Sequence, residues 1–419
     1  MKRRHRRYKI LFINSGGGHG GPSRFLYYLL CHLDRRRFEP LVAFYFLNDD
    51  SDTRKIRELG VPVLFLTDKR EPPHYVPIRW LLKDSSSKLL HTLKVSLRFS
   101  VRMLAVETPL ILGLRKLIHR EGVELVILNN DIHYHVAGTL GAGITGTPCI
   151  CRKAGGIGEG HTLKKFLTPW VDLFIAISRA TEEDQLQNNP STKKLVTVYE
   201  GIDLSLFSPH LHDYAKKGEL GIPFAKKVVG NISRFDRGKG QEELLEAAAL
   251  VVKSYPDAVF LLVGDGELMN ELRTRTEELN LTGHVLFTGW RSDIAAILSI
   301  TDIFVHCPTA PEGLGIANLE AMAMGKPSVV SENGGLPDAV LDKVTGYVVP
   351  PGDTEKLSRA ILRLLEDEGL ALQFGRNARY RIEEKFDIEK NVRKLEKLFL
   401  SLVRDESPEK GGAQWPSAC

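Results

Sequence analysis

Residues 311–352 read PEGLGIANLEAMAMGKPSVVSENGGLPDAVLDKVTGYVVPPG, and this stretch decides how the rest of the chain is interpreted. The pattern predicts a glycine loop, a short helix starting near Gly315, a strand, a glycine turn and a second strand. Gly325 and Pro327 are typical of the end of a helix. Backbone N–H groups at the helix start have no partner within the helix and lie at the positive end of its dipole. The loop and helix start therefore predict an anion site.

Two glutamates belong to this segment, Glu312 in the loop and Glu320 inside the helix. An ionised carboxylate only accepts hydrogen bonds, so it suits the hydroxyl groups of a sugar ring or a ribose. Two glutamates at this spacing also occur by chance on an ordinary amphipathic surface helix. The spacing alone leaves that second interpretation open.

The composition is that of an ordinary globular protein of two or three domains, with 419 residues, 43% hydrophobic and 26% charged. No apolar run approaches the roughly 20 residues of a membrane helix. The basic N-terminus is followed by an apolar run too short for a signal peptide, so a cytoplasmic protein is expected. The five cysteines are scattered, which argues against a disulfide framework or a zinc site. We interpret Asp50-Ser-Asp52 as a solvated loop and expect no metal site.

The charge is unevenly distributed along the chain. Residues 1–203 carry 31 Lys and Arg against 20 Asp and Glu, whereas residues 204–419 carry 26 against 32. Residues 69–120 concentrate the positive charge, with Trp80 and several leucines interleaved. Such a segment fits a helix pair on an anionic membrane surface, and equally an ordinary pair of surface helices over a sheet. Nucleic acid is not an expected partner, because no recognised binding module is present.

Apolar segments separated by helical patterns predict a parallel sheet covered on both faces in the first half. The first strand, Lys9–Asn14, runs into Ser15-Gly-Gly-Gly-His-Gly-Gly-Pro22 and then a helix, so Gly16, Gly17 and Gly18 form either a phosphate-binding loop or a plain tight turn. His133 and His135 follow a later strand, where a catalytic and a structural role are both open. The further strands are expected at Pro40–Leu47, Val61–Leu66, Leu125–Asn129, Pro148–Arg152, Leu173–Ser178 and Val196–Val198.

A second series of strands and helices begins at Lys227. The strand Val228–Ile232 is followed by a loop with Arg234 and Lys239, which leads into a helix. Two cations and a helix N-terminus at one place suit a diphosphate, whose developing charge needs such donors. A solvated basic turn is the alternative.

Several motifs together are similar to the family 4 glycosyltransferases of the GT-B fold. The resemblance extends over nearly all of residues 8–403 and is strongest from Gly201 to Asp353. The motifs are Tyr199-Glu-Gly-Ile-Asp203 with Phe207-Ser-Pro209, the Arg234 and Lys239 loop, Glu312-Gly-Leu-Gly315, Glu320-Ala-Met-Ala323, Gly325-Lys-Pro327, Gly334-Gly335, Gly346 and Pro351-Gly-Asp353.

The resemblance implies an α/β protein with two Rossmann-like domains whose parallel sheets face each other across a cleft. The expected domains are residues 1–205 on the acceptor side and residues 206–386 for the nucleotide sugar. A last helix, 387–403, is expected to pack back on the first domain, and the tail 404–419 to be disordered. The implied reaction moves a sugar from a nucleoside diphosphate to an acceptor hydroxyl with retention of configuration, using no metal and no cofactor. The donor nucleotide sugar is thus a substrate.

The resemblance also implies roles for individual residues. Arg234, Lys239 and the helix start at Gly313, Leu314, Gly315 and Ile316 would stabilise the leaving diphosphate. Glu312 would bind the donor sugar, Glu320 the ribose, Gly16 to Gly18 the diphosphate and sugar, and Trp290 would border the nucleobase. The family often places a histidine after the strand at 148–152. This chain has CRKAGGIGEGH at 151–161 instead, so Lys153, Glu159 or His161 would occupy that region.

Two other functions share this fold, a sugar-nucleotide epimerase and a non-catalytic nucleotide-sugar binder. The different carboxylates of the epimerases are not apparent, and the presence of all four charged donor-site residues argues against a binder. The basic surface of the first half favours an acceptor in cell-envelope polysaccharide, glycolipid or lipid-linked glycan synthesis. We therefore expect a cytoplasmic protein that is peripheral on the inner face of the membrane.

Overall fold

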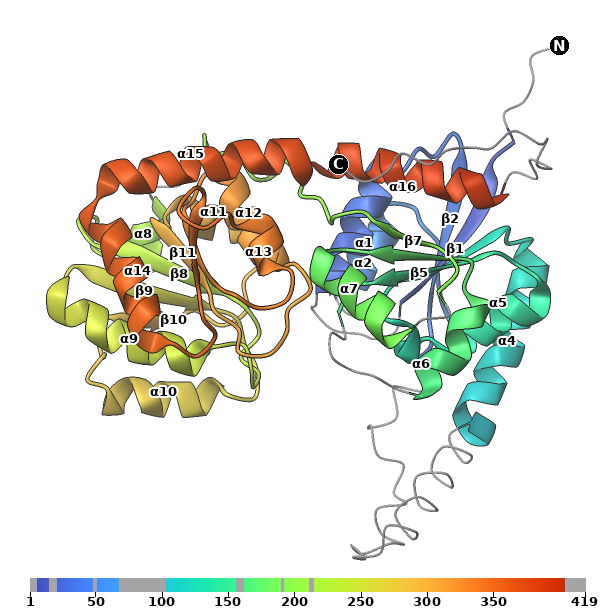
Figure 1. Ribbon diagram of the computed structural model, residues 1–419, viewed down its shortest axis with the longest axis horizontal. Coiled ribbons are helices and arrows are strands. Elements are labelled where there is room, and N and C mark those ends of the chain that lie inside the picture. Colours follow the sequence, from blue (N-terminus) through green and yellow to red (C-terminus); the bar gives the residue numbers. More distant parts are fainter. Residues whose placement is uncertain are drawn as a thin grey trace, which may run out of the picture.

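The computed structural model describes residues 6–14, 21–47, 51–67, 103–155, 162–189, 192–210 and 215–403. The predictions for Gly16, Gly17, Gly18, Glu159 and His161 lie outside these residues, as do those for most of 69–120 and for the tail 404–419. The described residues form two parallel sheets, each within its own half of the molecule (Figure 1).

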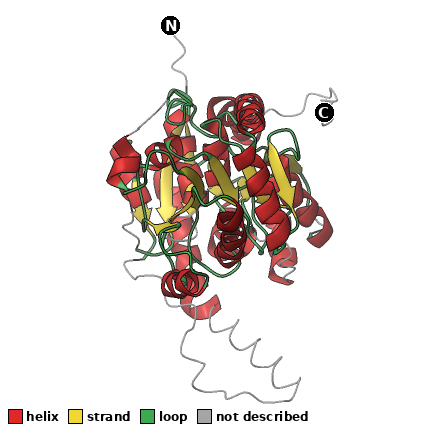
Figure 2. Ribbon diagram, turned by 90° about the vertical axis from the view of Figure 1, so that its left-hand side faces the viewer, coloured by secondary structure: helices red, strands yellow, loops and turns green. Residues whose placement is uncertain are grey.

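The first sheet has the strand order β3-β2-β1-β4-β5-β6-β7, and each adjacent pair is parallel. Its central strands are buried on both faces and need no alternation of apolar and polar residues. Figure 2 looks onto the second half and shows helices on both sides of the strands there. The strands of the first sheet are β1 (Tyr8–Asn14), β2 (Phe38–Phe44), β3 (Val63–Phe65), β4 (Leu125–Leu128), β5 (Cys149–Lys153), β6 (Leu173–Ala176) and β7 (Leu195–Thr197).

Helices and short turns of helix connect these strands, as parallel pairing requires. They are α1 (Gly21–His32), α2 (Ser51–Glu58), the π-helix η2 (Met103–Glu107), α4 (Thr108–Glu121), η3 (Ile132–Tyr134), α5 (Val136–Thr145), α6 (Thr162–Leu167), η4 (Thr168–Trp170) and α7 (Arg179–Asn188). Because Ser51 and Asp52 begin α2, the solvated loop predicted there is wrong for these two residues. The helix thus includes the second half of the acidic segment.

The second sheet has the order β10-β9-β8-β11-β12-β13 and is also parallel. Its strands are β8 (Lys227–Ile232), β9 (Ala258–Val263), β10 (Val285–Phe287), β11 (Ile303–His306), β12 (Ser328–Ser331) and β13 (Gly346–Val349). Its helices are α8 (Ala215–Glu219), α9 (Gln241–Ser254), α10 (Met269–Glu278), α11 (Ile294–Ser299), α12 (Ile316–Ala323), α13 (Leu336–Ala339), α14 (Thr354–Glu366) and α15 (Glu368–Lys385). The two sheets confirm the predicted α/β architecture.

Two elements were not predicted, one just before residues 311–352 and one within them. The strand β11 is four residues long, and α13 is a single turn placed where Gly334 and Gly335 predicted only a glycine turn. Pro337 lies in the first turn of α13, where its missing N–H costs nothing. So short a helix leaves no periodic apolar pattern in the sequence.

The last helix, α16 (Ile388–Val403), lies on the first half, while α15 lies on the second (Figure 1). Phe399 of α16 makes edge-to-face contacts with Phe12 and Phe38, with ring centroids 6.4 and 6.1 Å away. The chain passes from one half to the other near Ile202 and back again near Phe386. The two crossings lie side by side, since Ile202 donates its backbone N–H to the Phe386 carbonyl oxygen at 2.8 Å.

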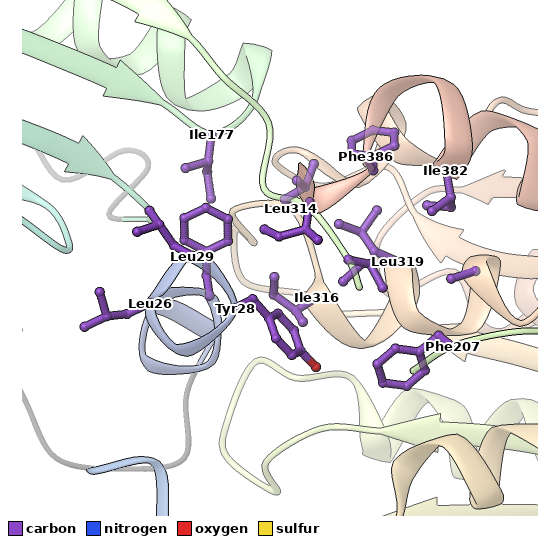
Figure 3. Packing of buried hydrophobic residues seen from close by; sticks show 14 of the residues in the cluster. Leu26, Tyr28, Leu29, Ile177, Phe207, Leu314, Ile316, Leu319, Ile382 and Phe386 are labelled. Carbon is purple, nitrogen blue, oxygen red and sulfur yellow. The ribbon is translucent and has the colours of Figure 1, made fainter. Parts of the chain in front are cut away.

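Apolar side chains from both halves form one buried cluster between the sheets (Figure 3). Tyr28 and Leu29 of α1 and Ile177 after β6 contribute from the first half, and Leu314 and Ile316 from the second. Burial of this apolar surface holds the start of residues 311–352 against the first half. The carboxyl ends of several strands from both sheets thus meet around residues 312–316.

Candidate active site

The loop before α12 has a backbone that glycine makes possible. Gly315 has a φ of +76°, in the left-handed region, and a Cβ there would lie 2.7 Å from Leu336 and 3.3 Å from His306. At Gly313 a Cβ would come within 2.6 Å of the carbonyl oxygen of Ala154, which belongs to the first half. The loop therefore turns sharply into α12 and directs the free N–H groups of the first turn back toward it.

Lys239 and Glu312 meet beside this helix start. The loop after β8 carries Lys239 and the loop after β11 carries Glu312, and the ammonium nitrogen lies 2.6 Å from one carboxylate oxygen. Both side chains are partly accessible, with 26% and 21% of their surface exposed. Burial raises the pKa of Glu312, but the charge of Lys239 and the proximity of His306 outweigh burial, so the net pKa is below its ordinary value. The carboxylate is therefore ionised at neutral pH.

Arg234, the other predicted diphosphate ligand, lies at the rim of the same site. Its mostly exposed guanidinium pairs with Asp236 at 2.8 Å, and its positive charge still contributes to the lowered pKa of Glu312. An exposed arginine in such a pair is held weakly and can turn toward an incoming phosphate.

Glu320 lies in a different environment from Glu312. It is fully buried, and Arg24 of α1 donates to its two oxygens at 3.1 and 3.2 Å, while the Tyr28 hydroxyl donates to one of them at 3.1 Å. Burial raises the pKa of Glu320, and Arg24 and Tyr28 only partly offset this effect. The predicted ribose ligand is thus bound to the opposite half in this structure.

The other predicted donor-site residues differ in accessibility. Leu314 and Ile316 are buried in the cluster between the halves, so only their backbone groups can serve a ligand. Trp290 follows β10 and has 48% of its surface exposed, as a side chain that stacks on a base would need.

A buried network of charges occupies the carboxyl ends of β4 and β5. Asp131 accepts from Lys153 and Lys164 at 2.9 and 3.0 Å and from His133 at 2.9 Å, and Lys153 also pairs with Asp184 at 2.6 Å. Burial would raise the pKa of Asp131, but these partners hold it well below its usual range. Lys153 was predicted here, whereas its partners were not. The one sequence feature that could have indicated these partners is the position of Asp131, shortly after a strand and before His133.

His135 has a structural role, since all of its contacts among the described residues are within the first half. Its ring is fully buried, and Nδ1 lies 3.0 Å from the Tyr45 hydroxyl, which also accepts from the Gly138 N–H. Burial lowers the pKa of His135 to about 3, so the ring is neutral. The structural alternative fits His135, while His133 lies on the edge of the Asp131 network.

Two further features of the site were not predicted from the sequence. Arg152 pairs with Glu200 in a fully buried contact, and the negative charge of Glu312 contributes to the raised pKa of Glu200, which is caused mainly by burial. His306, the last residue of β11, lies under the start of α12. In the sequence, His306 is marked only as a polar residue at the end of a short apolar strand.

Taken as chemistry, this arrangement joins a helix start, two cations and an ionised carboxylate at one edge of a sheet. Such a site can neutralise a diphosphate and accept hydrogen bonds from sugar hydroxyls. Among the described residues no group of three or more histidine, cysteine, aspartate or glutamate side chains is arranged to hold a metal ion. Within the same residues, no helix is both long and apolar enough to cross a bilayer.

Comparisons with known proteins agree with this chemistry. The profile of the family described as "Glycosyl transferases group 1" matches residues 214–381. The chain is 29% identical over 309 residues to the UDP-Gal:alpha-D-GlcNAc-diphosphoundecaprenol alpha-1,3-galactosyltransferase of Escherichia coli, covering 70% of this chain and 79% of that protein. It is 30% identical over 246 residues to the N-acetyl-alpha-D-glucosaminyl L-malate synthase of Bacillus anthracis, covering 59% of this chain and 64% of that protein.

The fold is also similar to that of solved glycosyltransferases. The crystal structure of Anabaena Alr3699/HepE in complex with UDP-glucose superposes with a TM-score of 0.76 at 25% identity, covering 94% of this chain and 99% of that chain. The sucrose-phosphate synthase of Thermosynechococcus elongatus superposes with a TM-score of 0.75 at 20% identity, covering 94% and 99% of the two chains. The matching family profile and the glycosyltransferases among the sequence relatives bear out the glycosyltransferase prediction over the epimerase and the non-catalytic binder. Residues 214–381 thus match the group 1 glycosyl transferases, and the chain is a glycosyltransferase of the GT-B fold.

Proposed function

We propose that this enzyme transfers a hexose from a nucleoside diphosphate sugar to a hydroxyl group of a lipid-linked or cell-envelope glycan, with retention of the anomeric configuration. The observation that carries the proposal is the Lys239–Glu312 pair beside the start of α12. In this pair a cation suited to binding a diphosphate lies beside a carboxylate suited to binding sugar hydroxyls. The first half, residues 1–205, would receive the acceptor, and residues 206–386 the donor.

The donor would be held by residues of the second half. Lys239, Arg234 and the N–H groups of the first turn of α12 would neutralise the charge that develops on the leaving diphosphate. Glu312 would accept hydrogen bonds from donor sugar hydroxyls. Glu320 would bind the ribose after exchanging part of its contact with Arg24. Gly16 to Gly18 would lie against the diphosphate and Trp290 against the base.

Retention would proceed by attack on the same face from which the diphosphate leaves. The bond from the anomeric carbon to the phosphate oxygen breaks and the bond to the acceptor oxygen forms, while the acceptor proton passes to the departing phosphate. Support comes from the carboxylates around the site. Glu312, Glu200 and Glu320 are each paired with a cation, namely Lys239, Arg152 and Arg24. None of these three stands free as a nucleophile.

The acceptor and the membrane are the finer part of the proposal. The Escherichia coli relative is named for an acceptor linked to diphosphoundecaprenol. In the described part of the basic stretch, α4 exposes Leu112, Arg115, Lys116 and Arg120 on one side. A basic face with an apolar residue suits an anionic membrane, where each Lys or Arg contributes about 1 kcal/mol. We therefore place the enzyme at the inner face of the cytoplasmic membrane.

A thermal-shift panel of UDP-, GDP- and ADP-sugars tests the donor, because a ligand that binds only the folded state raises the melting temperature. We expect one nucleotide class to stabilise the protein. NMR of the product with a lipid-linked glycan acceptor then gives the anomeric configuration. Stabilisation by none of the nucleotide sugars would contradict the proposal, and conversion of the nucleotide sugar into an epimer without acceptor would replace it.

A further inference from the structure

His306 has an unusual environment for a histidine. It ends β11, only 4% of its surface is exposed, and neither ring nitrogen has a hydrogen-bond partner among the described residues. Buried polar groups without partners destabilise a fold, so an apolar residue would be the simpler occupant of this position. A polar ring in this place therefore points to a role outside the packing of the sheet.

The geometry around His306 indicates what that role is. Its Nε2 lies 3.9 Å from Glu312 Oε2, and this same oxygen receives the Lys239 ammonium at 2.6 Å. A distance of 3.9 Å is too long for a hydrogen bond, but a shift of the carboxylate by about 1 Å would close it. The ring edge also lies under Gly315, so it is held in place by the start of α12.

Donor binding would change what Lys239 contacts. In the proposed function Lys239 serves the diphosphate, and its ammonium then shares its hydrogen bonds between phosphate oxygens and Glu312. Glu312 would be left as a partly buried carboxylate with a weakened partner at the moment when it must hold the sugar. The His306 ring then lies 3.9 Å from this carboxylate, within reach of a small shift.

We propose that His306 is a positioning residue that hydrogen-bonds Glu312 when Lys239 turns to the donor diphosphate, an inference that rests on the proposed function. The Nε2–H donates to Oε2 and leaves the other carboxylate oxygen for the donor sugar. The ring remains neutral throughout and no proton is transferred, because burial lowers its pKa to about 4. A neutral donor orients the carboxylate without competing with Lys239 for the role of counter-charge.

The test compares three variants of His306 by calorimetry. The probes are the pairs UDP and UDP-glucose, UDP and UDP-N-acetylglucosamine, UDP and UDP-galactose, GDP and GDP-mannose, and ADP and ADP-glucose. The readout is the ratio of the affinity for the sugar nucleotide to that for the matching nucleoside diphosphate, taken for the pair that binds most tightly. His306→Leu and His306→Phe should lower this ratio about tenfold and leave the nucleoside diphosphate within about twofold, because only the sugar contact depends on Glu312. His306→Gln keeps an N–H at a similar reach and should preserve the ratio.

A double-mutant cycle with Glu312→Ala separates positioning from packing. If His306 acts through Glu312, adding His306→Leu to Glu312→Ala should change the ratio less than twofold. A full tenfold loss in that background, or a wild-type ratio in both apolar variants, would overturn the inference alone. An unchanged ratio in Glu312→Ala itself would overturn the proposed function and the inference with it. If neither apolar variant folds, His306→Gln decides, and a tenfold loss in it overturns the inference.

Discussion

Arg24 of α1 and Glu320 of α12, separated by 296 residues in the sequence, form an ion pair at 3.1 Å that joins the two halves of the enzyme. The carboxylate is fully buried and the guanidinium is partly exposed. The residue proposed to bind the ribose therefore also holds the halves together, and nucleotide binding and the relative position of the halves are connected through one side chain.

Glu320→Gln should weaken the binding of UDP, GDP or ADP, whichever the enzyme uses, by about tenfold, the cost of losing a charged acceptor for ribose hydroxyls. Isothermal titration calorimetry measures it. The matched control is Arg24→Gln, which breaks the same ion pair but keeps the carboxylate, and it should retain nucleotide affinity. Equal losses in the two variants would assign the effect to the contact between the halves. Unchanged affinity in Glu320→Gln would show the ribose role to be wrong.

Lys239→Ala should lower kcat/KM for sugar transfer by about 100-fold or more, because it removes a preorganised charge from the leaving diphosphate. Release of the nucleoside diphosphate is measured in a coupled assay. Lys239→Arg, which keeps the charge, should recover part of the rate. The exposed Lys356 on α14, which pairs with Asp353 instead, serves as a control when changed to alanine. Near-normal rates in both Lys239→Ala and Arg234→Ala would refute the diphosphate assignment.

Glu312→Gln should lower kcat more than it raises KM. Contacts to the donor sugar become stronger as the ring acquires positive charge, so losing the negative charge affects the transition state more than the bound donor. Steady-state kinetics with a varied donor concentration separates the two constants. A variant with raised KM and normal kcat would indicate that Glu312 only binds the ground state.

Acid should destabilise the folded protein below pH 6.5. The pKa values of His135 and His306 are lowered by burial to about 3 and about 4. As the pH falls from 6.5 toward these values, the unfolded chain takes up protons that the folded chain does not, so stability is lost as pH falls and is fully present above pH 6.5. Each histidine should lower the free energy of unfolding by roughly 2 kcal/mol as the pH falls from 7.5 to 5.

Urea unfolding at a series of pH values measures this dependence. His135→Asn keeps an acceptor near the Tyr45 hydroxyl but does not titrate, so its stability should fall less steeply between pH 6.5 and 5. The His306→Gln variant should behave in the same way at its own position. A slope equal to that of the wild type in both variants would assign the acid sensitivity to other groups.

Anionic vesicles should sediment the wild-type protein at low salt, and neutral vesicles should not. Replacing Arg115, Lys116 and Arg120 on α4 with Gln should weaken this binding, and adding Arg79, Lys83, Lys88, Lys94 and Arg98, which lie outside the described residues, should abolish it. Replacing the exposed Arg359 and Arg363 of α14 in the second half is the matched control. Nucleotide affinity should stay normal in all of these variants. A wild-type protein that ignores anionic vesicles at low salt would favour a soluble acceptor.

Local sequence signals were sufficient for much of the fold. Continuous apolar runs such as Lys9–Asn14 and Val228–Ile232 predicted central strands of parallel sheets, and β1 and β8 are found there within one residue of each predicted boundary. Gly315 and Gly325 predicted the start and end of α12. Both have a positive φ, a backbone conformation that favours glycine, so the residue type itself indicates the boundary. The donor-site residues came from motif resemblance rather than from periodicity.

Only the tertiary structure decided which of these residues meet. Lys239 and Glu312 are 73 residues apart, and their contact depends on the β8 and β11 strands being neighbours in the sheet. The pairing of Glu320 with Arg24, the burial of Lys153 among carboxylates and the position of His306 beneath Gly315 all depend on how helices pack on the sheets and on how the two halves meet. A sequence pattern records the preferences of neighbouring residues, whereas the charge state and partner of a buried side chain depend on the dielectric surroundings that distant segments create.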